Sequence, residues 1–326
     1  MKAYTINNYG APEKVLKLIE TDTPAPKDSE VLVKVYATTI NDYDWCISTG
    51  KPFAYRLIFG LFSPKRKLRI PGMEVAGMVE AVGAKVTTFT VGDAVYGDIS
   101  SFGFGSFAEF LCIHEKALAL KPATMTFEEA TSIPHAAMLA LQGLRDVGEI
   151  KDGQKILING GGGGVGAFGI QLAKGYKVDV TGVDTGEKLK AMRAQGYDRV
   201  IDYKKEDFTK LGERYDLILD CRTNRSLWKF LKVLTPQGKY VSIGGKSGKL
   251  LQMLYMRPLL TLFSKKRMYM VMLKANKDLN YIHTLYNDRK IQCVIDGPYP
   301  FDQLPWAVQR FGDGLHHGKI VISVRQ

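Results

Sequence analysis

The chain has few cysteines, and their spacing excludes two common ways of stabilising a fold. Its 326 residues contain four, at Cys46, Cys112, Cys221 and Cys293, with no C-x-x-C pair. Neither a disulfide framework nor a zinc cluster of closely spaced cysteines is therefore indicated. No apolar run approaches the ~20 residues that cross a bilayer as a helix, and Met1–Tyr4 opens no signal peptide. The sequence predicts a cytoplasmic protein.

Compositional bias is lacking as well. Only 13 residues are proline, and the chain shows neither internal repeats nor low-complexity tracts, which excludes collagen-like, coiled-coil and disordered architectures. Instead, 45% of the residues are hydrophobic and 10% are aromatic. A chain of this length and apolar content is expected to form about two domains with sizeable cores.

Acidic residues are scarce in one part of the chain. Lys and Arg number 45 against 33 Asp and Glu, which gives a net charge of +12. The stretch from Arg222 to Lys290 holds 15 basic and two acidic residues, so this block carries +13 and the remainder −1. Such a block could meet nucleic acid, anionic lipid or an anionic cofactor, or it could be an ordinary solvated surface.

The first third of the chain has the pattern of a β-rich domain. Up to about residue 122, short β-like runs alternate with Gly, Pro and Asp punctuation, at Glu30–Val35, Val75–Val82 and Phe107–Cys112. After about Ile291 the chain returns to β character, as in Ile320–Val324. We expect this tail to rejoin the first domain.

From Phe127 onward the pattern becomes an alternation of helix and strand. Strand Lys155–Ile158 leads into a glycine-rich loop, a helix over Ala167–Lys174 and a second strand at Val178–Val183. This order is one βαβ unit. Later β runs that follow helical stretches extend it into a doubly wound parallel sheet, at Leu217–Leu219 and Lys239–Ile243.

The glycine-rich loop carries a dinucleotide-binding pattern. Gly161, Gly163 and Gly166 form G-x-G-x-x-G directly between a strand and a helix. Glycines permit the tight turn, and the amides that open the next helix, those of Gly164 and Val165, can receive a pyrophosphate. A flexible glycine linker fits poorly, because apolar runs flank the loop on both sides.

The residues expected near the adenosine ribose point in two directions. Asp184 stands 18 positions after Gly166, where an acid accepts hydrogen bonds from the ribose hydroxyls and favours NAD(H). Nearby, Thr185, Lys188 and Tyr203 could instead hold a 2′-phosphate. Either Asp184 or Lys188 could also be a plain surface charge, which is the commoner fate of such residues.

Several short motifs then follow one another in a fixed order. They are Ile40–Trp45, Pro71–Gly77, Val91–Val95, Gly105–Glu109, the glycine loop, Val200–Tyr203, Val241–Gly245 and Gly318–Val321. Together they resemble the medium-chain dehydrogenase/reductase superfamily, and within it the zinc-free quinone oxidoreductase-like branch. The resemblance covers nearly the whole chain. It implies an α/β protein with a GroES-like β-rich catalytic domain, residues 1–124 plus 291–326, and an inserted Rossmann domain, residues 125–290.

The resemblance also bears on metal chemistry. In zinc-dependent relatives, Cys, His and Cys or Asp hold the catalytic metal, and these positions align with Asn41, Met73 and His135. A neutral amide and a thioether do not complete a zinc site. The resemblance therefore implies hydride transfer from a reduced nicotinamide to an already activated acceptor, either a quinone or the β-carbon of an α,β-unsaturated carbonyl.

Such a transfer places negative charge on the acceptor oxygen, which needs a hydrogen-bond donor. Asn41 matches the family asparagine beside the nicotinamide, and Asp44 matches the aspartate that braces this loop. Tyr43 and His135 are further candidate donors. His135 follows Pro134 at a helix start, where the helix dipole disfavours the imidazolium, so a neutral ring is expected. His135 could equally be a helix-start residue that fills the space vacated by zinc.

The cofactor expectation also rests on the resemblance. The arginine that often accompanies a 2′-phosphate is missing near Asp184, but Lys188 and Tyr203 match phosphate contacts in other quinone reductases of the branch. NADPH is therefore expected, with NADH as the alternative and no zinc. Ile243 and Gly244, within the Val241–Gly245 motif, complete the expected cofactor contacts.

Two stretches pair apolar residues with cations. Phe53–Phe62 precedes Lys65–Lys67, and Leu250–Met256 leads toward Lys265–Arg267. They could line a pocket for a lipophilic acceptor, lie on an anionic membrane as peripheral segments, or be core helices flanked by solvated lysines. The next run, Met268–Leu273, is expected to be the last Rossmann strand, an edge that commonly pairs with its twin in family homodimers.

Two functions remain in competition at this point. The first is a zinc-independent NAD(P)H-dependent oxidoreductase that acts on a small lipophilic carbonyl or quinone. The alternative is an NADPH-binding protein with little turnover that uses its basic surface to bind RNA or anionic membrane. Because the sequence offers no RNA-binding motif, catalysis is the leading hypothesis and nucleic acid is not an expected partner.

Overall fold

The computed structural model describes residues 1–244, 252–253, 256 and 264–325, and it contains two compact units. The first comprises Met1–His135, Ala275–His283 and Ile295–Gln326, and the second Ala136–Lys274 and Thr284–Val294. The predicted fold class, a GroES-like domain with an inserted Rossmann domain, is confirmed. Most of the second lipophilic stretch, Leu250–Met256, lies outside the described residues.

The first boundary between the units lies at His135 rather than at the predicted residue 124. The reason is helix α4, Phe127–Ser132, which packs on the first unit. The Phe127 ring stacks on Tyr36 at a centroid distance of 4.5 Å, and Ser323 donates a hydrogen bond to Glu128 (2.7 Å). These contacts extend the first unit beyond the last of its early strands.

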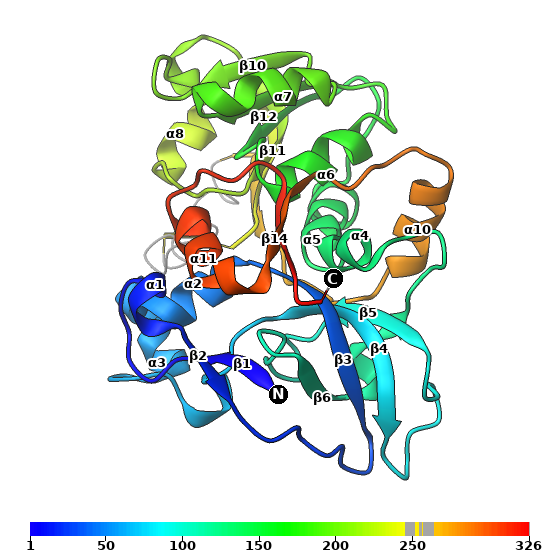
Figure 1. The fold of residues 1–326 in the computed structure, drawn as a ribbon. Helices are drawn as coiled ribbons and strands as arrows, with labels where there is room; N and C mark the ends of the chain where they lie inside the picture. The colour runs from blue at the N-terminus through cyan, green and yellow to red at the C-terminus, as the bar shows by residue number, and fades with distance from the viewer. Residues whose placement is uncertain (245–251, 254–255, 257–263, 326) are drawn as a thin grey trace. The chain divides into compact units, whose positions relative to one another are not determined.

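The first unit is built on a seven-stranded sheet, of which Figure 1 labels strands β3, β4, β5, β6 and β14. The strand order is β14-β15-β3-β4-β5-β7, with β6 also paired to β3. In strand β3, the alternate residues Val31, Val33 and Val35 are buried, as expected for a strand with one face on a core. The bounds are β3 Glu30–Thr39, β4 Glu74–Val82, β5 Ala94–Asp98, β6 Phe110–His114, β7 Ala119–Leu120, β14 Ile295–Pro300 and β15 Lys319–Ser323.

Strand β15 pairs antiparallel with β3, so the C-terminal tail rejoins the first unit as predicted. A second core, built around Ile40, Ile47 and Phe107, lies under the short helices of this unit. The remaining elements of the unit are β1 Lys2–Thr5, β2 Lys17–Glu20, α1 Pro12–Val15, α2 Asp42–Thr49, α3 Arg56–Phe59 and α11 Leu304–Gly312.

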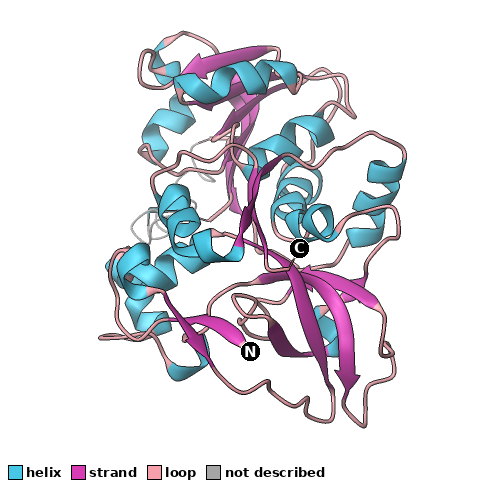
Figure 2. Cartoon of the chain, viewed as in Figure 1, coloured by secondary structure: helices cyan, strands magenta, loops and turns pink. Residues whose placement is uncertain are grey.

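The second unit contains a six-stranded parallel sheet in the order β10-β9-β8-β11-β12-β13, which Figure 2 shows with its covering helices. Ile156, Leu157 and Ile158 are all fully buried, because both faces of the sheet are covered. The strands are β8 Lys155–Asn159, β9 Asp179–Asp184, β10 Arg199–Asp202, β11 Tyr215–Asp220, β12 Leu234–Ser242 and β13 Arg267–Met270.

The helices of the second unit begin with α5, Ala136–Leu141, which continues into a π-helical turn over Gln142–Val147. They are followed by α6 Gly164–Ala173, α7 Leu189–Ala194, α8 Leu227–Lys232 and α10 Leu279–Asn287, of which α10 spans the boundary between the units. The expected last strand is present as β13 at the edge of the sheet. None of the helices within the described residues has the length and apolarity to cross a membrane.

Candidate active site

The loop between β3 and α2 is fixed by a buried carboxylate. Asp44 accepts a hydrogen bond from the Asn41 backbone N–H at Oδ2 (2.8 Å) and one from the Gly72 N–H at Oδ1 (2.9 Å). Complete burial raises the pKa of Asp44 to about 7, although both N–H bonds act in the opposite direction. Asp44 therefore joins the first turn of α2 to the segment that leads into β4.

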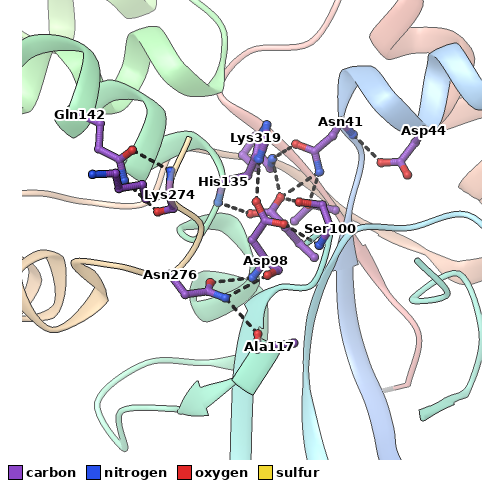
Figure 3. A network of polar contacts seen from close by, with 12 residues as sticks. Asn41, Asp44, Asp98, Ser100, Ala117, His135, Gln142, Lys274, Asn276 and Lys319 are labelled. Carbon is purple, nitrogen blue, oxygen red and sulfur yellow. Dashed lines mark hydrogen bonds and ion pairs between the residues drawn. The ribbon is translucent and has the colours of Figure 1, made fainter. Parts of the chain in front are cut away.

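Asn41 lies in a buried ion-pair cluster (Figure 3). Its side-chain amide donates to Glu74 Oε2 (2.9 Å) and to Thr39 Oγ1 (3.2 Å), and its Oδ1 accepts a hydrogen bond from the Lys319 ammonium. Lys319 Nζ also lies 2.6 Å from Glu74 Oε2. Both amide hydrogens of Asn41 thus have partners within the chain, and the Lys319 charge is balanced by Glu74.

His135 is held by two carboxylates. Its Nδ1 lies 2.8 Å from Asp98 Oδ2, and its backbone N–H donates to Glu74 Oε1 (2.7 Å). Asp98 is further fixed by the Ser100 N–H, which donates to its other oxygen (2.9 Å). Figure 3 shows His135 and Asp98 beside the Lys319 and Asn41 side chains.

The surroundings of His135 differ from those on which the sequence-based expectation rested. Burial disfavours the imidazolium, but the hydrogen bond and charge of Asp98 outweigh burial and raise the pKa of His135 above its ordinary value. For Asp98, burial on its own would raise the pKa of the carboxyl group, but the hydrogen bonds from His135 and Ser100 outweigh burial and lower this pKa. The surroundings therefore oppose the expected neutral ring, because the carboxylate of Asp98 favours the charged form.

Tyr43 lies in an aromatic cluster. Its ring makes edge contacts with Tyr55, Phe59 and Phe104, at centroid distances of 6.4, 5.9 and 6.4 Å. Burial, followed by the charge of Asp42, raises the pKa of the Tyr43 phenol. The hydroxyl therefore keeps its proton at neutral pH, and the ring contributes to an apolar wall beside α2.

In the second unit, the glycine loop and helix α6 approach each other closely. A Cβ atom added at Gly166 would lie 2.5 Å from the Gly161 carbonyl oxygen, so only glycine fits there. The Tyr197 hydroxyl donates to the carbonyl oxygens of Gly161 (3.2 Å) and Gly166 (3.0 Å). Gly163 caps α6, and the amides of Gly164, Val165 and Gly166 open the ten-residue helix. This arrangement fits a pyrophosphate.

Asp184, at the end of β9, is bonded to the same loop. Its Oδ2 accepts from the Gly162 N–H (2.9 Å), its Oδ1 accepts from the Thr185 N–H (2.8 Å), and Lys188 Nζ lies 3.5 Å from Oδ1. Asp184 and Lys188 are each only 7% exposed. The alternative that either is a plain surface charge is therefore wrong, since the two form a buried pair.

The other predicted cofactor residues lie at neighbouring strand ends. The Tyr203 N–H donates to the Asp184 carbonyl oxygen (3.1 Å), because β10 runs beside β9. Ile243 donates to the Asp220 carbonyl oxygen (3.0 Å) at the end of β12, and Gly244 follows with a φ of 93°. The carboxyl ends of parallel strands are where a doubly wound sheet binds its ligand.

Comparison with known proteins agrees with this geometry. Residues 27–123 match the alcohol dehydrogenase GroES-like domain, and residues 195–322 match the zinc-binding dehydrogenase family. The chain is 30% identical to the chloroplast envelope quinone oxidoreductase homolog of Arabidopsis thaliana, over 99% of this chain and 98% of that protein. It is 33% identical to the 2-methylene-furan-3-one reductase of Solanum lycopersicum, over 99% of this chain and 79% of that protein.

The chain belongs to the medium-chain dehydrogenase/reductase superfamily, in its quinone oxidoreductase-like branch. Among solved structures, the quinone oxidoreductase of Coxiella burnetii superposes with a TM-score of 0.87 at 28% identity, covering 100% of this chain and 99% of that one. The whole chain therefore has the superfamily fold, including the inserted nucleotide domain.

The residues of this dehydrogenase do not fit the zinc of its metal-dependent relatives. At the three aligned positions, Asn41 Oδ1 is engaged by the Lys319 ammonium and the Met73 thioether is fully buried. The third residue, His135, bonds to Asp98 through Nδ1 and is the one ordinary zinc ligand of the three, which is too few for a zinc site. Over the described parts of the chain, no group of three His, Cys, Asp or Glu side chains is arranged to hold a metal ion.

Sequence reasoning missed four residues that the structure brings to these sites. Glu74 and Lys319 lie within motifs that carry the family resemblance, but their pairing across the sheet was not anticipated. Asp98 ends β5 without any motif, and Asn276 bonds to it from a distant segment, accepting from the Asp98 N–H (2.9 Å). The one sequence signal that could have pointed to Asp98 is the position of an acid at the end of an apolar strand.

Proposed function

We propose that this dehydrogenase reduces a conjugated carbonyl or a quinone with NADPH and without a metal ion. The observation that carries the proposal is the Lys319 ammonium on Asn41 Oδ1, because a fixed cation there leaves the amide oxygen without a role as a metal ligand. Its relatives support the acceptor class, since they include a quinone oxidoreductase homolog and a 2-methylene-furan-3-one reductase.

The residues of the first unit suit such a reduction. When bound, the reduced nicotinamide supplies the hydride, and charge then develops on the acceptor oxygen. His135 is oriented through Nδ1 by Asp98, so its Nε2–H is the donor left for that oxygen. The bond to Asp98 raises the pKa of His135 and so favours retention of this second proton, which can be delivered when the reduced acceptor is protonated.

The geometry around Asp184 supports NADPH over NADH. Both carboxylate oxygens of Asp184 already accept backbone N–H bonds, and Lys188 neutralises the charge. An acid engaged in this way has less capacity to accept bonds from ribose hydroxyls, while Lys188 and Tyr203 offer a cation and a phenol near a 2′-phosphate. One relative at 32% identity carries the name NADPH-dependent alkenal/one oxidoreductase.

The test is a spectrophotometric panel that pairs each cofactor with enones, quinones and simple ketones. Oxidation of NADPH is expected with the conjugated acceptors and not with the ketones, and preincubation with a chelator should leave the rate unchanged. Loss of activity on chelation, with recovery on adding zinc, would refute metal independence. Cofactor binding without turnover across the panel would favour the alternative of a binding protein.

A variant at Lys188 tests the cofactor assignment. Lys188→Met removes the cation nearest Asp184, so NADPH binding is expected to weaken by about tenfold while NADH binding changes less. Titration of both cofactors by fluorescence would measure the two dissociation constants. Lys190→Met, an exposed residue two positions along the same chain segment, is the matched control and should leave both constants unchanged. Equal weakening of both cofactors in the Lys188 variant would contradict the NADPH assignment.

A further inference from the structure

One stretch of the first unit, residues 45–73, contains no Asp or Glu. It carries six cations, which are Lys51, Arg56, Lys65, Arg66, Lys67 and Arg69. Within the described residues, no carboxylate lies within ion-pair distance of any of them, whereas Lys34, Lys85 and Lys174 elsewhere in the chain all have such partners. The stretch is therefore a local source of uncompensated positive charge.

The inner side of this stretch is firmly attached to the fold. Phe59 and Leu68 are buried in the core under the short helices, and the Lys65 N–H donates to the Phe59 carbonyl oxygen (2.7 Å). The Tyr9 hydroxyl donates to the Gly60 carbonyl oxygen (2.6 Å), and the Arg56 guanidinium lies 4.6 Å from the centroid of the Tyr9 ring. These contacts fix which side chains of the stretch point outward.

The outward side chains are strongly apolar. Phe62 is 87% exposed and Leu57 is 69% exposed, although both lie within a few residues of the buried Phe59. The exposed apolar group consists of Phe53, Leu57, Ile58, Leu61 and Phe62, and the exposed cations Lys65, Arg66, Lys67 and Arg69 follow it after two intervening residues. Large apolar side chains gathered on a surface in this way mark an interaction site.

We propose that residues 53–69, which we call the basic apolar loop, dock on the surface of an anionic lipid bilayer. Aromatic and aliphatic side chains enter the boundary between headgroups and acyl chains, while Lys and Arg contact the anionic headgroups. This partner satisfies both properties of the loop. Nucleic acid would leave the apolar group unused, and a symmetric contact with a second copy would place the six cations of one chain against six of the same sign.

The docking is independent of the proposed reaction, and binding to vesicles tests it without any turnover. The full chain is sedimented with vesicles of phosphatidylcholine alone and with vesicles that also contain phosphatidylglycerol. Binding is expected only to the second kind and should weaken as salt screens the charges. Two variants separate the apolar contribution from the electrostatic one. The first combines Leu57→Ser and Phe62→Ser and removes apolar side chains. The second combines Lys65→Gln, Arg66→Gln and Lys67→Gln and removes positive charge. Each should weaken binding by about tenfold or more.

A matched control comes from the second unit. Trp228 on α8 is 63% exposed and is also followed by lysines, so Trp228→Ser with Lys232→Gln removes a similar exposed pair elsewhere. This control should bind vesicles like the native chain. Thermal unfolding and NADPH titration identify any variant that has lost its fold. Equal binding to both vesicle types, unchanged binding by both loop variants, or a loop effect on self-association alone would overturn the proposal.

Discussion

The ion pair between His135 and Asp98 shows how one neighbour decides what a residue can do. From its position at a helix start, His135 is expected to be neutral, but a carboxylate 2.8 Å from Nδ1 favours the charged ring. The same contact orients the ring and assigns the proton on Nδ1. A side chain that is ambiguous in the sequence thereby becomes a defined donor.

Replacing Asp98 with Asn tests this donor role. The neutral amide removes the charge that raises the pKa of His135, so burial then lowers that pKa and the second proton is lost at a lower pH. As pH rises, kcat should therefore begin to decline at a lower pH than in the native chain, and kcat at neutral pH should fall by about 100-fold. Steady-state kinetics across pH, with a quinone as acceptor, would measure both effects.

The control for this variant is Asp93→Asn, which changes a carboxylate that accepts hydrogen bonds from the exposed Thr90. Its pH profile should match that of the native chain. The His135–Asp98 pair also stabilises the fold below the ordinary pKa of histidine, and this contribution should be lost as pH rises through the raised pKa. A pH profile of Asp98→Asn that coincides with the native one would exclude His135 as the donor.

Lys319 and Glu74 form a buried ion pair that stabilises the fold only when both residues are present. Lys319→Met leaves the fully buried Glu74 carboxylate without its counter-charge, so the free energy of unfolding should fall by about 3–5 kcal/mol. Adding Glu74→Gln removes the isolated charge and should restore part of that loss. Urea unfolding of the single and double variants would measure the difference.

An exposed pair provides the comparison. Lys155 and Glu213 lie 3.6 Å apart with side chains 55% and 41% exposed, so Lys155→Met should cost at most about 1 kcal/mol. If Lys319→Met cost no more than Lys155→Met, then Lys319 would not be the buried counter-ion of Glu74 that the proposed function assumes.

At the scale of elements, local patterns predicted most strands and helices well. Helix α6 and strands β8 and β9 lie within a few residues of their expected bounds, because apolar runs bounded by glycine are local signals. Strand β6 was expected at Phe107–Cys112 but spans Phe110–His114. The difference is tertiary, since the Phe107 carbonyl oxygen accepts the Tyr4 N–H (2.8 Å) and this part of the chain therefore pairs with the first strand instead.

The contact between the glycine loop and α6 gives a prediction at this scale. Gly166→Ala places a methyl group 2.5 Å from a backbone oxygen that cannot move without opening the loop. We expect a loss of roughly 1–3 kcal/mol in the free energy of unfolding, together with weaker NADPH binding. Gly169→Ala, in the same helix, meets only flexible side-chain atoms at 3.3 Å and beyond and is the matched control. If both variants bound NADPH equally well, close loop packing would not be required for the cofactor.

For the whole molecule, the nucleotide should act as a stabilising ligand and zinc should not. A ligand at 100 times its Kd that binds only the folded state adds about 2.7 kcal/mol to the free energy of unfolding. NADPH is therefore expected to raise Tm, whereas zinc should leave it unchanged because the aligned donor set does not fit the metal. Calorimetry with each ligand would measure the shifts, and an increase in Tm with zinc would contradict the metal-free assignment.

The sequence alone determined the two-domain fold, the glycine loop and the positions of Asn41, Asp44 and His135, since each depends on a short motif or a local period. Only the tertiary structure decided how these residues are charged and paired. Asn41 and Lys319 lie 278 positions apart, and the register of β15 on β3 brings them together. The alternation of apolar and polar residues predicts that a strand is half buried, but it does not say which strand lies beside it. That choice depends on packing across the whole unit, and it decides which side chains meet at the site.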